Sequence, residues 1–113
     1  MITIYHNPRC SKSRQTLGYL KESGESLKIK EYLKDPITAS ELQDILSKLG
    51  IRSQDIIRRN EKLYKELFKG KDLTESQWVQ VLVEHPILIE RPIVVKDQKA
   101  VLGRPPEKVK QLL

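Results

Sequence analysis

The chain has 113 residues, of which 38% are hydrophobic and 32% are charged, proportions typical of one folded domain rather than of a disordered segment. Its single cysteine excludes an internal disulfide and a cysteine-rich zinc site, and the lack of any run of about 18 apolar residues excludes a membrane-spanning helix. The net charge of +6 comes without a continuous basic run or interleaved aromatic residues, so we expect a cytoplasmic monomer that binds neither nucleic acid nor membranes.

The N-terminal part of the chain predicts a strand, a helix and a second strand. Residues 2–5 form a short apolar run that ends at an Asn-Pro pair, a pattern typical of a buried strand and not of a signal peptide. The segment 11–23 contains no proline and stops before a glycine, so we expect a helix there. Apolar and charged residues alternate over 27–30, which predicts a half-buried strand and completes a βαβ unit with a parallel crossover.

The middle of the chain is predicted to be helical. Capping-box patterns begin at Thr38 and Thr74 and precede apolar residues at helical spacing, and Asn60 is a candidate cap for a further helix between them. These apolar stripes are typical of a packed core and indicate no cofactor site. We expect them to form a helical insertion, over about 38–85, within a single domain that spans 1–113.

The C-terminal part returns to a strand pattern. The β-forming runs over 93–95 and 99–102 are separated by a turn, which predicts a hairpin, and a Pro-Pro pair at 105–106 precedes a last helix. The full order is βαβ, a helical insertion, then ββα. This order predicts an α/β protein with a four-stranded mixed sheet on the thioredoxin-like plan.

The functional prediction depends on Cys10. It follows a strand and a turn and opens a helix, where unpaired N–H groups and the helix dipole favour the thiolate. Residues 1–21 hold four basic residues and no acidic residue, so the surroundings of this thiol are positively charged. A lone cysteine is more often a small buried hydrophobic residue, but this position favours a nucleophile or a redox group.

The residues around Cys10 narrow the possible reactions. The motif at 10–13 is C-x-x-S, so any redox cycle must take a second thiol from another molecule. The phosphatase pattern C-x5-R is absent, because Thr16 stands where that pattern requires arginine. His6 either assists the thiol or only contacts the turn backbone, and Ser13 either donates a hydrogen bond to the thiolate or only belongs to the first helical turn.

Arginines in three segments are candidates for binding an oxyanion. Arg91 precedes a proline and the first hairpin strand, where thioredoxin-like folds hold a cis proline against the thiol loop, and Arg104 follows the second strand. Either Arg58 or Arg59 is the third candidate. Each arginine alone is typical of a solvated surface, whereas converging guanidinium groups suit a tetrahedral oxyanion.

Four separated motifs resemble one known family from end to end. They are Ile-Tyr-His-Asn-Pro-Arg-Cys-Ser-Lys-Ser-Arg over 4–14, Ile-Ile-Arg-Arg-Asn over 56–60, His-Pro-Ile-Leu-Ile-Glu-Arg-Pro-Ile-Val-Val over 85–95 and Gly-Arg-Pro-Pro-Glu over 103–107. In their order they resemble the glutathione- and glutaredoxin-coupled arsenate reductases, in a subgroup with a Cys-Ser-Lys-Ser loop. The resemblance implies a thioredoxin-like fold with a helical insertion.

The same resemblance implies a reaction and a set of roles. It implies reduction of arsenate to arsenite through a thioarsenate on the cysteine, with glutathione and glutaredoxin as external reductants and with no bound cofactor or metal. The implied nucleophile is Cys10, and the implied thiolate-assisting residues are His6 and Ser13. The implied oxyanion-binding residues are Arg58, Arg91 and Arg104.

Two other functions remain open. Transcription-regulating relatives of similar fold bind RNA polymerase, but they typically carry C-x-x-C and lack Gly-Arg-Pro at the end of the hairpin. A general glutathione-dependent thiol oxidoreductase acting on glutathionylated proteins would use Cys10 but would not need three arginines. The C-x-x-S motif and Arg104 therefore favour the reductase.

Overall fold

The chain forms two compact units in the computed structural model, which describes residues 1–113; the two ends of the chain make up one unit and the middle makes up the other. Unit 1 consists of Met1–Asp35 and Arg91–Leu113, and unit 2 consists of Pro36–Glu90. The helical segment expected over 38–85 falls within unit 2. None of the helices is both long enough and apolar enough to cross a membrane.

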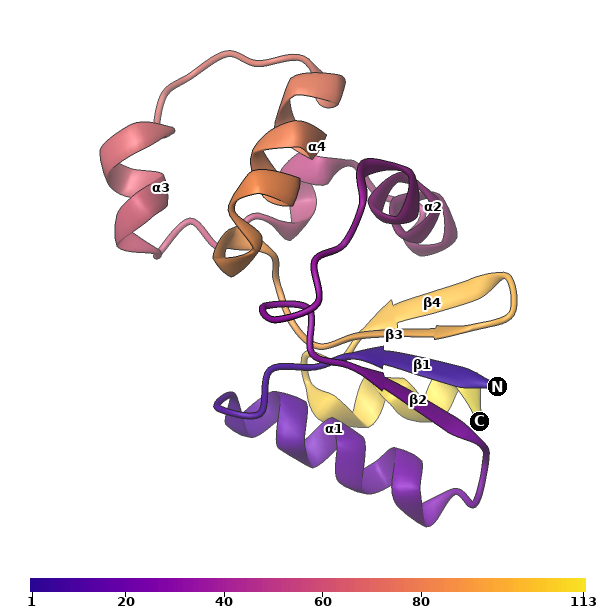
Figure 1. Ribbon diagram of the computed structural model, residues 1–113. Coiled ribbons are helices and arrows are strands. Elements are labelled where there is room, and N and C mark those ends of the chain that lie inside the picture. The colour runs from indigo at the N-terminus through magenta and orange to yellow at the C-terminus, as the bar shows by residue number, and fades with distance from the viewer. The chain divides into compact units, whose positions relative to one another are not determined.

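Unit 1 is built on a four-stranded mixed sheet with the strand order β2-β1-β3-β4 (Figure 1). β1 (Ile2–Tyr5) pairs in parallel with β2 (Leu27–Lys30), and α1 (Ser11–Glu22) connects the two strands. β3 (Ile93–Lys96) pairs antiparallel with both β1 and β4 (Lys99–Leu102). The predicted βαβ unit, hairpin and mixed sheet are confirmed.

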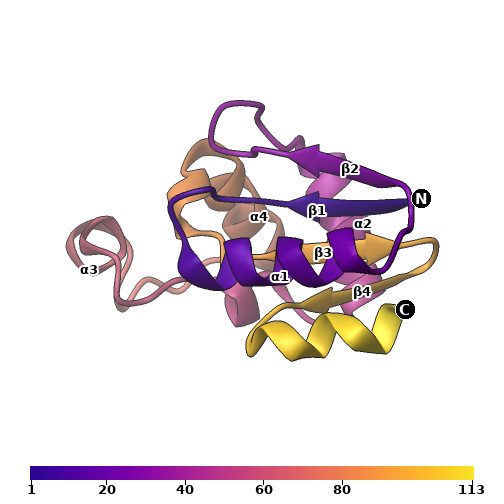
Figure 2. The same ribbon diagram turned by 90° about the horizontal axis from the view of Figure 1, so that it is seen from below.

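Two helices cover one face of this sheet. α1 and the 3₁₀ helix η3 (Pro106–Leu112) lie side by side against it (Figures 1 and 2). The turn between α1 and β2 contains Gly24, whose left-handed φ of 77° suits a residue without a Cβ. The core between helices and strands consists of Ile2, Ile4, Leu20, Val94, Val109 and Leu112.

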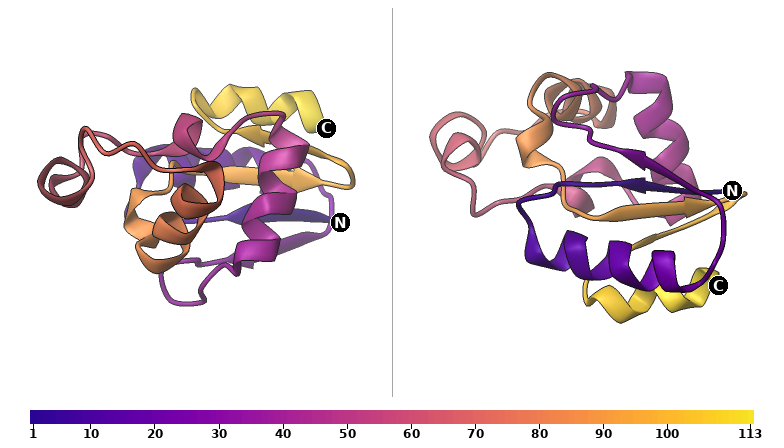
Figure 3. Two further views of the ribbon diagram at one scale, coloured as in Figure 1. Left: turned by 90° about the horizontal axis from the view of Figure 1, so that it is seen from above. Right: turned by 60° about the horizontal axis from the view of Figure 1, so that its bottom comes forward.

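Unit 2 contains α2 (Ala39–Leu49), α3 (Lys62–Leu67) and α4 (Glu75–Glu84). Thr38 and Thr74 form complete capping boxes at the starts of α2 and α4, as their sequences predict. α2 packs against α4. α3 lies at the end of two extended segments (Figure 3), and its Tyr64 ring stacks on Trp78 of α4 with the ring centres 6.5 Å apart.

The prediction that Asn60 caps α3 is wrong. The N-cap of α3 is Glu61, and its side chain makes no capping hydrogen bond. The carboxylate of Glu61 pairs instead with the guanidinium of Arg58 at 2.5 Å. This contact is charge-assisted, and such contacts are stronger than neutral hydrogen bonds.

Candidate active site

Three segments that carry predicted site residues lie at the same end of the sheet in unit 1. The strand register aligns Tyr5 with Ile93, and Ile93 with Leu102. The chain therefore leaves β1 into the cysteine loop, enters β3 from Arg91, and leaves β4 towards Arg104 at one common end, opposite the N-terminus (Figure 2).

Cys10 is the N-cap residue of α1, with extended backbone, and its side chain is buried. A tight turn holds it there, because its N–H donates to the carbonyl of Asn7 at 3.0 Å and its carbonyl accepts from the N–H of Arg14 at 3.0 Å. The first turn of α1 contains no acidic residue, and Arg9 and Lys12 are exposed beside it. These surroundings favour a negative charge at the start of the helix.

His6 and Ser13 hydrogen bond to each other inside unit 1. Nδ1 of His6 lies 2.6 Å from Oγ of Ser13, and the same oxygen accepts from the N–H of Asn7 at 3.1 Å. Both side chains are buried, that of Ser13 completely. This contact ties the loop that carries Cys10 to the first turn of α1. No hydrogen bond joins either side chain to Cys10, so their action on the thiol stays a prediction.

The environment of His6 keeps its imidazole neutral at pH 7. Burial lowers the pKa of His6 from its usual 6.5, the carboxylate of Glu31 opposes this shift, and Arg14 and Lys21 add to it. A neutral imidazole has one protonated and one unprotonated ring nitrogen, so Nδ1 can either donate to Ser13 or accept from it.

The free energy of unfolding should therefore decrease at mildly acidic pH through His6. The unfolded histidine takes up a proton as the pH falls through about 6.5, whereas the folded histidine resists protonation, so the unfolded state binds more protons and gains stability. Urea unfolding of the wild type and of His6→Asn between about pH 7.5 and about pH 5.5 measures this difference. We expect the free energy of unfolding to fall more steeply with decreasing pH in the wild type than in His6→Asn. An equal fall in both proteins would contradict the lowered pKa of His6.

Arg91 and Arg104 are linked by two hydrogen bonds between their segments. Nε of Arg104 donates to the carbonyl of Arg91 at 2.7 Å, and the N–H of Gly103 donates to the carbonyl of Pro92 at 2.9 Å. The Arg91-Pro92 bond is cis, as expected for this position of the fold, and the Arg104-Pro105 bond is also cis. Both arginine side chains are half-buried.

Arg58 belongs to unit 2, where an isolated antiparallel bridge joins Ile57 to Ile89. Its N–H donates to the carbonyl of Leu88 at 2.8 Å, and its guanidinium lies 2.5 Å from the carboxylate of Glu61 and 3.8 Å from that of Glu90. An anion that binds Arg58 must therefore compete with two carboxylates. Convergence of Arg58 with Cys10 stays a prediction.

Arg59 is engaged in local contacts of unit 2. It donates to the hydroxyl of Tyr64 at 2.7 Å and to the carbonyl of Gln54 at 3.1 Å, and its guanidinium lies 5.5 Å from the centre of the Tyr64 ring. A side chain held by an aromatic ring and a carbonyl offers fewer donors to a ligand. Both guanidinium groups are therefore engaged within unit 2, and these contacts do not distinguish Arg58 from Arg59 as the anion-binding candidate.

Sequence reasoning missed Thr16 and Gly103 as parts of this region. Thr16 drew attention only as the residue that breaks a phosphatase pattern, and Gly103 only as part of a motif. Both are buried, and Gly103 lies against both Thr16 and Pro92. No periodicity reveals a contact between residues that are so far apart in the chain.

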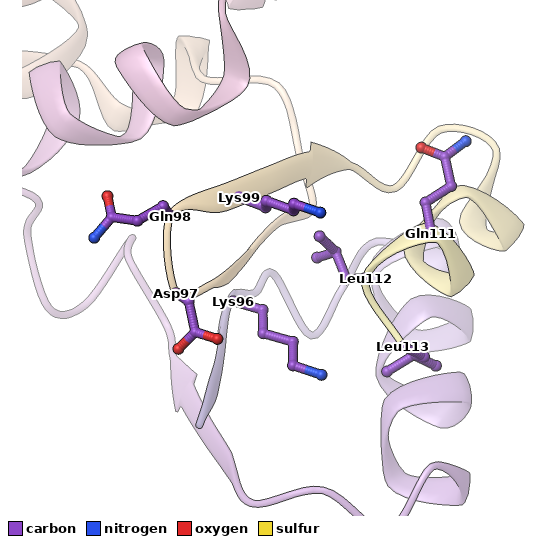
Figure 4. A pocket seen from close by; sticks show the side chains of 7 residues that line it. All are labelled: Lys96, Asp97, Gln98, Lys99, Gln111, Leu112 and Leu113. Atoms are coloured by element: carbon purple, nitrogen blue, oxygen red, sulfur yellow. The ribbon is translucent and has the colours of Figure 1, made fainter.

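A surface pocket of unit 1 lies at the opposite end of the sheet, around the β3–β4 turn and the last residues of η3 (Figure 4). None of the predicted site residues lines it. The lining residues are Lys96, Asp97, Gln98, Lys99, Gln111, Leu112 and Leu113. No group of three or more His, Cys, Asp or Glu side chains is arranged to hold a metal ion.

The fold and the position of the thiol together define a class of protein. The sheet is mixed, a cysteine stands at the start of the helix that follows the first strand, and a cis proline precedes the third strand. These features define a thioredoxin-like protein with a single thiol. The model of the ArsC family matches residues 5–112, and the chain belongs to that family. The predicted family and thioredoxin-like fold are confirmed.

Individual relatives match the chain along nearly its whole length. It is 47% identical to the uncharacterized protein YfgD of Escherichia coli K12, covering 99% of this chain and 96% of that protein. It is 44% identical to an arsenate reductase of Haemophilus influenzae, covering 99% of this chain and 98% of that protein. The solved structure of an arsenate reductase from Vibrio cholerae matches with a TM-score of 0.94 at 42% identity, covering 99% of this chain and 97% of that one.

Proposed function

We propose that this protein reduces arsenate to arsenite, with Cys10 as the nucleophile. The observation that carries the proposal is the arrangement in unit 1. Cys10 begins α1 at the same end of the sheet where Arg91 and Arg104 are hydrogen bonded to each other. The names of the relatives from Haemophilus influenzae and Vibrio cholerae support the choice of arsenate as the substrate.

Arg91 and Arg104 bind the oxyanion in this proposal. Guanidinium groups form paired, charge-assisted hydrogen bonds with tetrahedral oxyanions, and their positive charge lowers the cost of bringing an anion to a thiolate. His6 and Ser13 assist the thiolate by shaping the loop that presents it, since their mutual hydrogen bond ties this loop to α1.

The reaction proceeds through bonds between sulfur and arsenic. Sγ of Cys10 attacks As(V), an As–O bond breaks, and the oxygen leaves as water. The sulfur of glutathione then binds arsenic, with loss of a second water. A glutaredoxin thiolate attacks the glutathione sulfur to form a disulfide, and the electron pair of the broken As–S bond stays on arsenic, which becomes As(III). Water cleaves the remaining bond to Cys10 and releases arsenite.

External thiols are needed because the chain has one cysteine. An intramolecular disulfide cannot form, so the two electrons that reduce arsenic must come from two other thiols. Glutathione and glutaredoxin supply them in this proposal, and both act in the reducing environment of the cytoplasm.

The test is arsenate reduction by the purified protein, followed by the formation of arsenite. We expect turnover only when arsenate, glutathione and glutaredoxin are all present, and a loss of turnover when any one of them is omitted. Reduction of a glutathionylated substrate without reduction of arsenate would instead assign the protein as a general thiol oxidoreductase, which needs the thiol but no oxyanion site.

A further inference from the structure

Gly103 occupies a place in unit 1 where no side chain fits. A Cβ added to this buried glycine would lie 2.7 Å from Cγ of Pro92, 2.7 Å from Oγ1 of Thr16 and 3.2 Å from Cγ2 of Thr16. Ordinary contacts between carbon atoms are about 3.5–4.0 Å. Glycine is therefore required here for close approach, since its φ does not lie in the left-handed region.

Thr16 cannot easily move out of this contact. Its side chain is fully buried, and its Oγ1 donates to the carbonyl of Lys12 at 2.9 Å. That hydrogen bond and the branch at Cβ hold the side chain in one rotamer. Thr16 lies in the second turn of the helix that Cys10 begins, so its contact with Gly103 joins the cysteine helix to the chain after β4.

Gly103 and Pro92 are each next to one of the proposed anion-binding arginines. Gly103 precedes Arg104, and Pro92 follows Arg91. The hydrogen bonds from Gly103 to Pro92 and from Arg104 to Arg91 join the two segments. Displacing one segment from α1 must therefore displace the other as well.

We propose that Gly103 and Thr16 are positioning residues that set the distance between the cysteine helix and the segments bearing Arg91 and Arg104. As far as it concerns arsenate, this inference rests on the proposed function. A side chain at position 103 separates these segments from α1, so the guanidinium groups no longer meet an oxyanion at Cys10. Misplacing a binding group by about 1 Å costs up to about 100-fold in rate.

The main experiment measures Gly103→Ala against Gly18→Ala. Gly103→Ala should raise the KM for arsenate at least about tenfold, while the rate at which iodoacetamide alkylates Cys10 changes less than about twofold, because the reagent is neutral and needs no arginine. Gly18 lies on α1 with nothing within 4 Å of an added Cβ, so Gly18→Ala should leave both quantities unchanged. A folded Gly103→Ala protein with the wild-type KM would overturn the inference.

Two further variants keep the inference testable if Gly103→Ala does not fold. Thr16→Val places a methyl group where Oγ1 contacts Gly103 and should raise the KM severalfold. Adding Thr16→Ala to Gly103→Ala removes two of the three close contacts and should recover part of the loss. An unchanged KM in Thr16→Val, or no recovery in the double variant, would contradict positioning through this contact.

A spectroscopic measurement separates this inference from the proposed function. The Nε–H of Arg104, hydrogen bonded to the carbonyl of Arg91, should give a slowly exchanging NMR signal in the wild type and in Gly18→Ala. Gly103→Ala should shift this signal and speed its exchange; an unchanged signal would overturn the inference. A wild type that neither binds nor reduces arsenate would contradict the proposed function alone, and the Arg104 signal would still decide the positioning.

Discussion

Cys10→Ser should lower arsenate reduction by at least about 1,000-fold, to the level seen without protein, because removal of a covalent nucleophile removes most of the catalysis. A serine hydroxyl at the start of α1 remains protonated at neutral pH and forms no sulfur–arsenic bond. The measurement is arsenite formation by wild type and variant at equal protein concentration, with saturating glutathione and glutaredoxin.

The fold of the Cys10→Ser variant must be unchanged for this comparison. Serine and cysteine are similar in size, and Sγ makes no capping hydrogen bond, so the substitution leaves the turn before α1 and its backbone hydrogen bonds in place. Ser11→Ala, at the exposed first residue of α1, is the matched control and should keep wild-type activity. Equal rates in wild type and Cys10→Ser would exclude the sulfur–arsenic intermediate.

Local patterns account for the elements that were predicted correctly. The capping boxes at Thr38 and Thr74 form within four residues, and the strands over 27–30 and 99–102 are short runs that end at turns. Such signals need no knowledge of the rest of the fold. The half-buried face expected from the alternation over 27–30 is wrong, because Ile29 is exposed. Asn60 misled the prediction because the N-cap of α3 is the next residue, Glu61, whose carboxylate pairs with Arg58 and does not cap the helix.

The candidate site likewise has features that the sequence indicates and features that only the structure reveals. The segments that carry Cys10, Arg91 and Arg104 lie at one end of the sheet because β3 runs antiparallel to both β1 and β4. The sequence leaves open whether His6 and Ser13 meet, since that depends on the turn at 7–10. It also does not reveal the contact between Thr16 and Gly103, which joins residues from opposite ends of the chain.

Arg91→Ala and Arg104→Ala should each lower kcat/KM for arsenate by about 10- to 150-fold. One charge-assisted hydrogen bond is worth about 1.5–3 kcal/mol, which corresponds to that range. Lysine at either position keeps the charge but loses the planar pair of donors, so the lysine variants should lie between wild type and alanine. Lys108→Ala removes one positive charge at an exposed position of η3 and should change kcat/KM less than about twofold.

The effects of the two arginines should not be additive. Arg104→Ala also removes the hydrogen bond to the carbonyl of Arg91, so it loosens the segment that presents the other guanidinium. The double variant should therefore lose less than the product of the two single losses, with a coupling of about 0.5–3 kcal/mol. Independent anion sites would give strictly multiplicative losses. Such a result would show that the bond between the two segments does not help to bind the oxyanion.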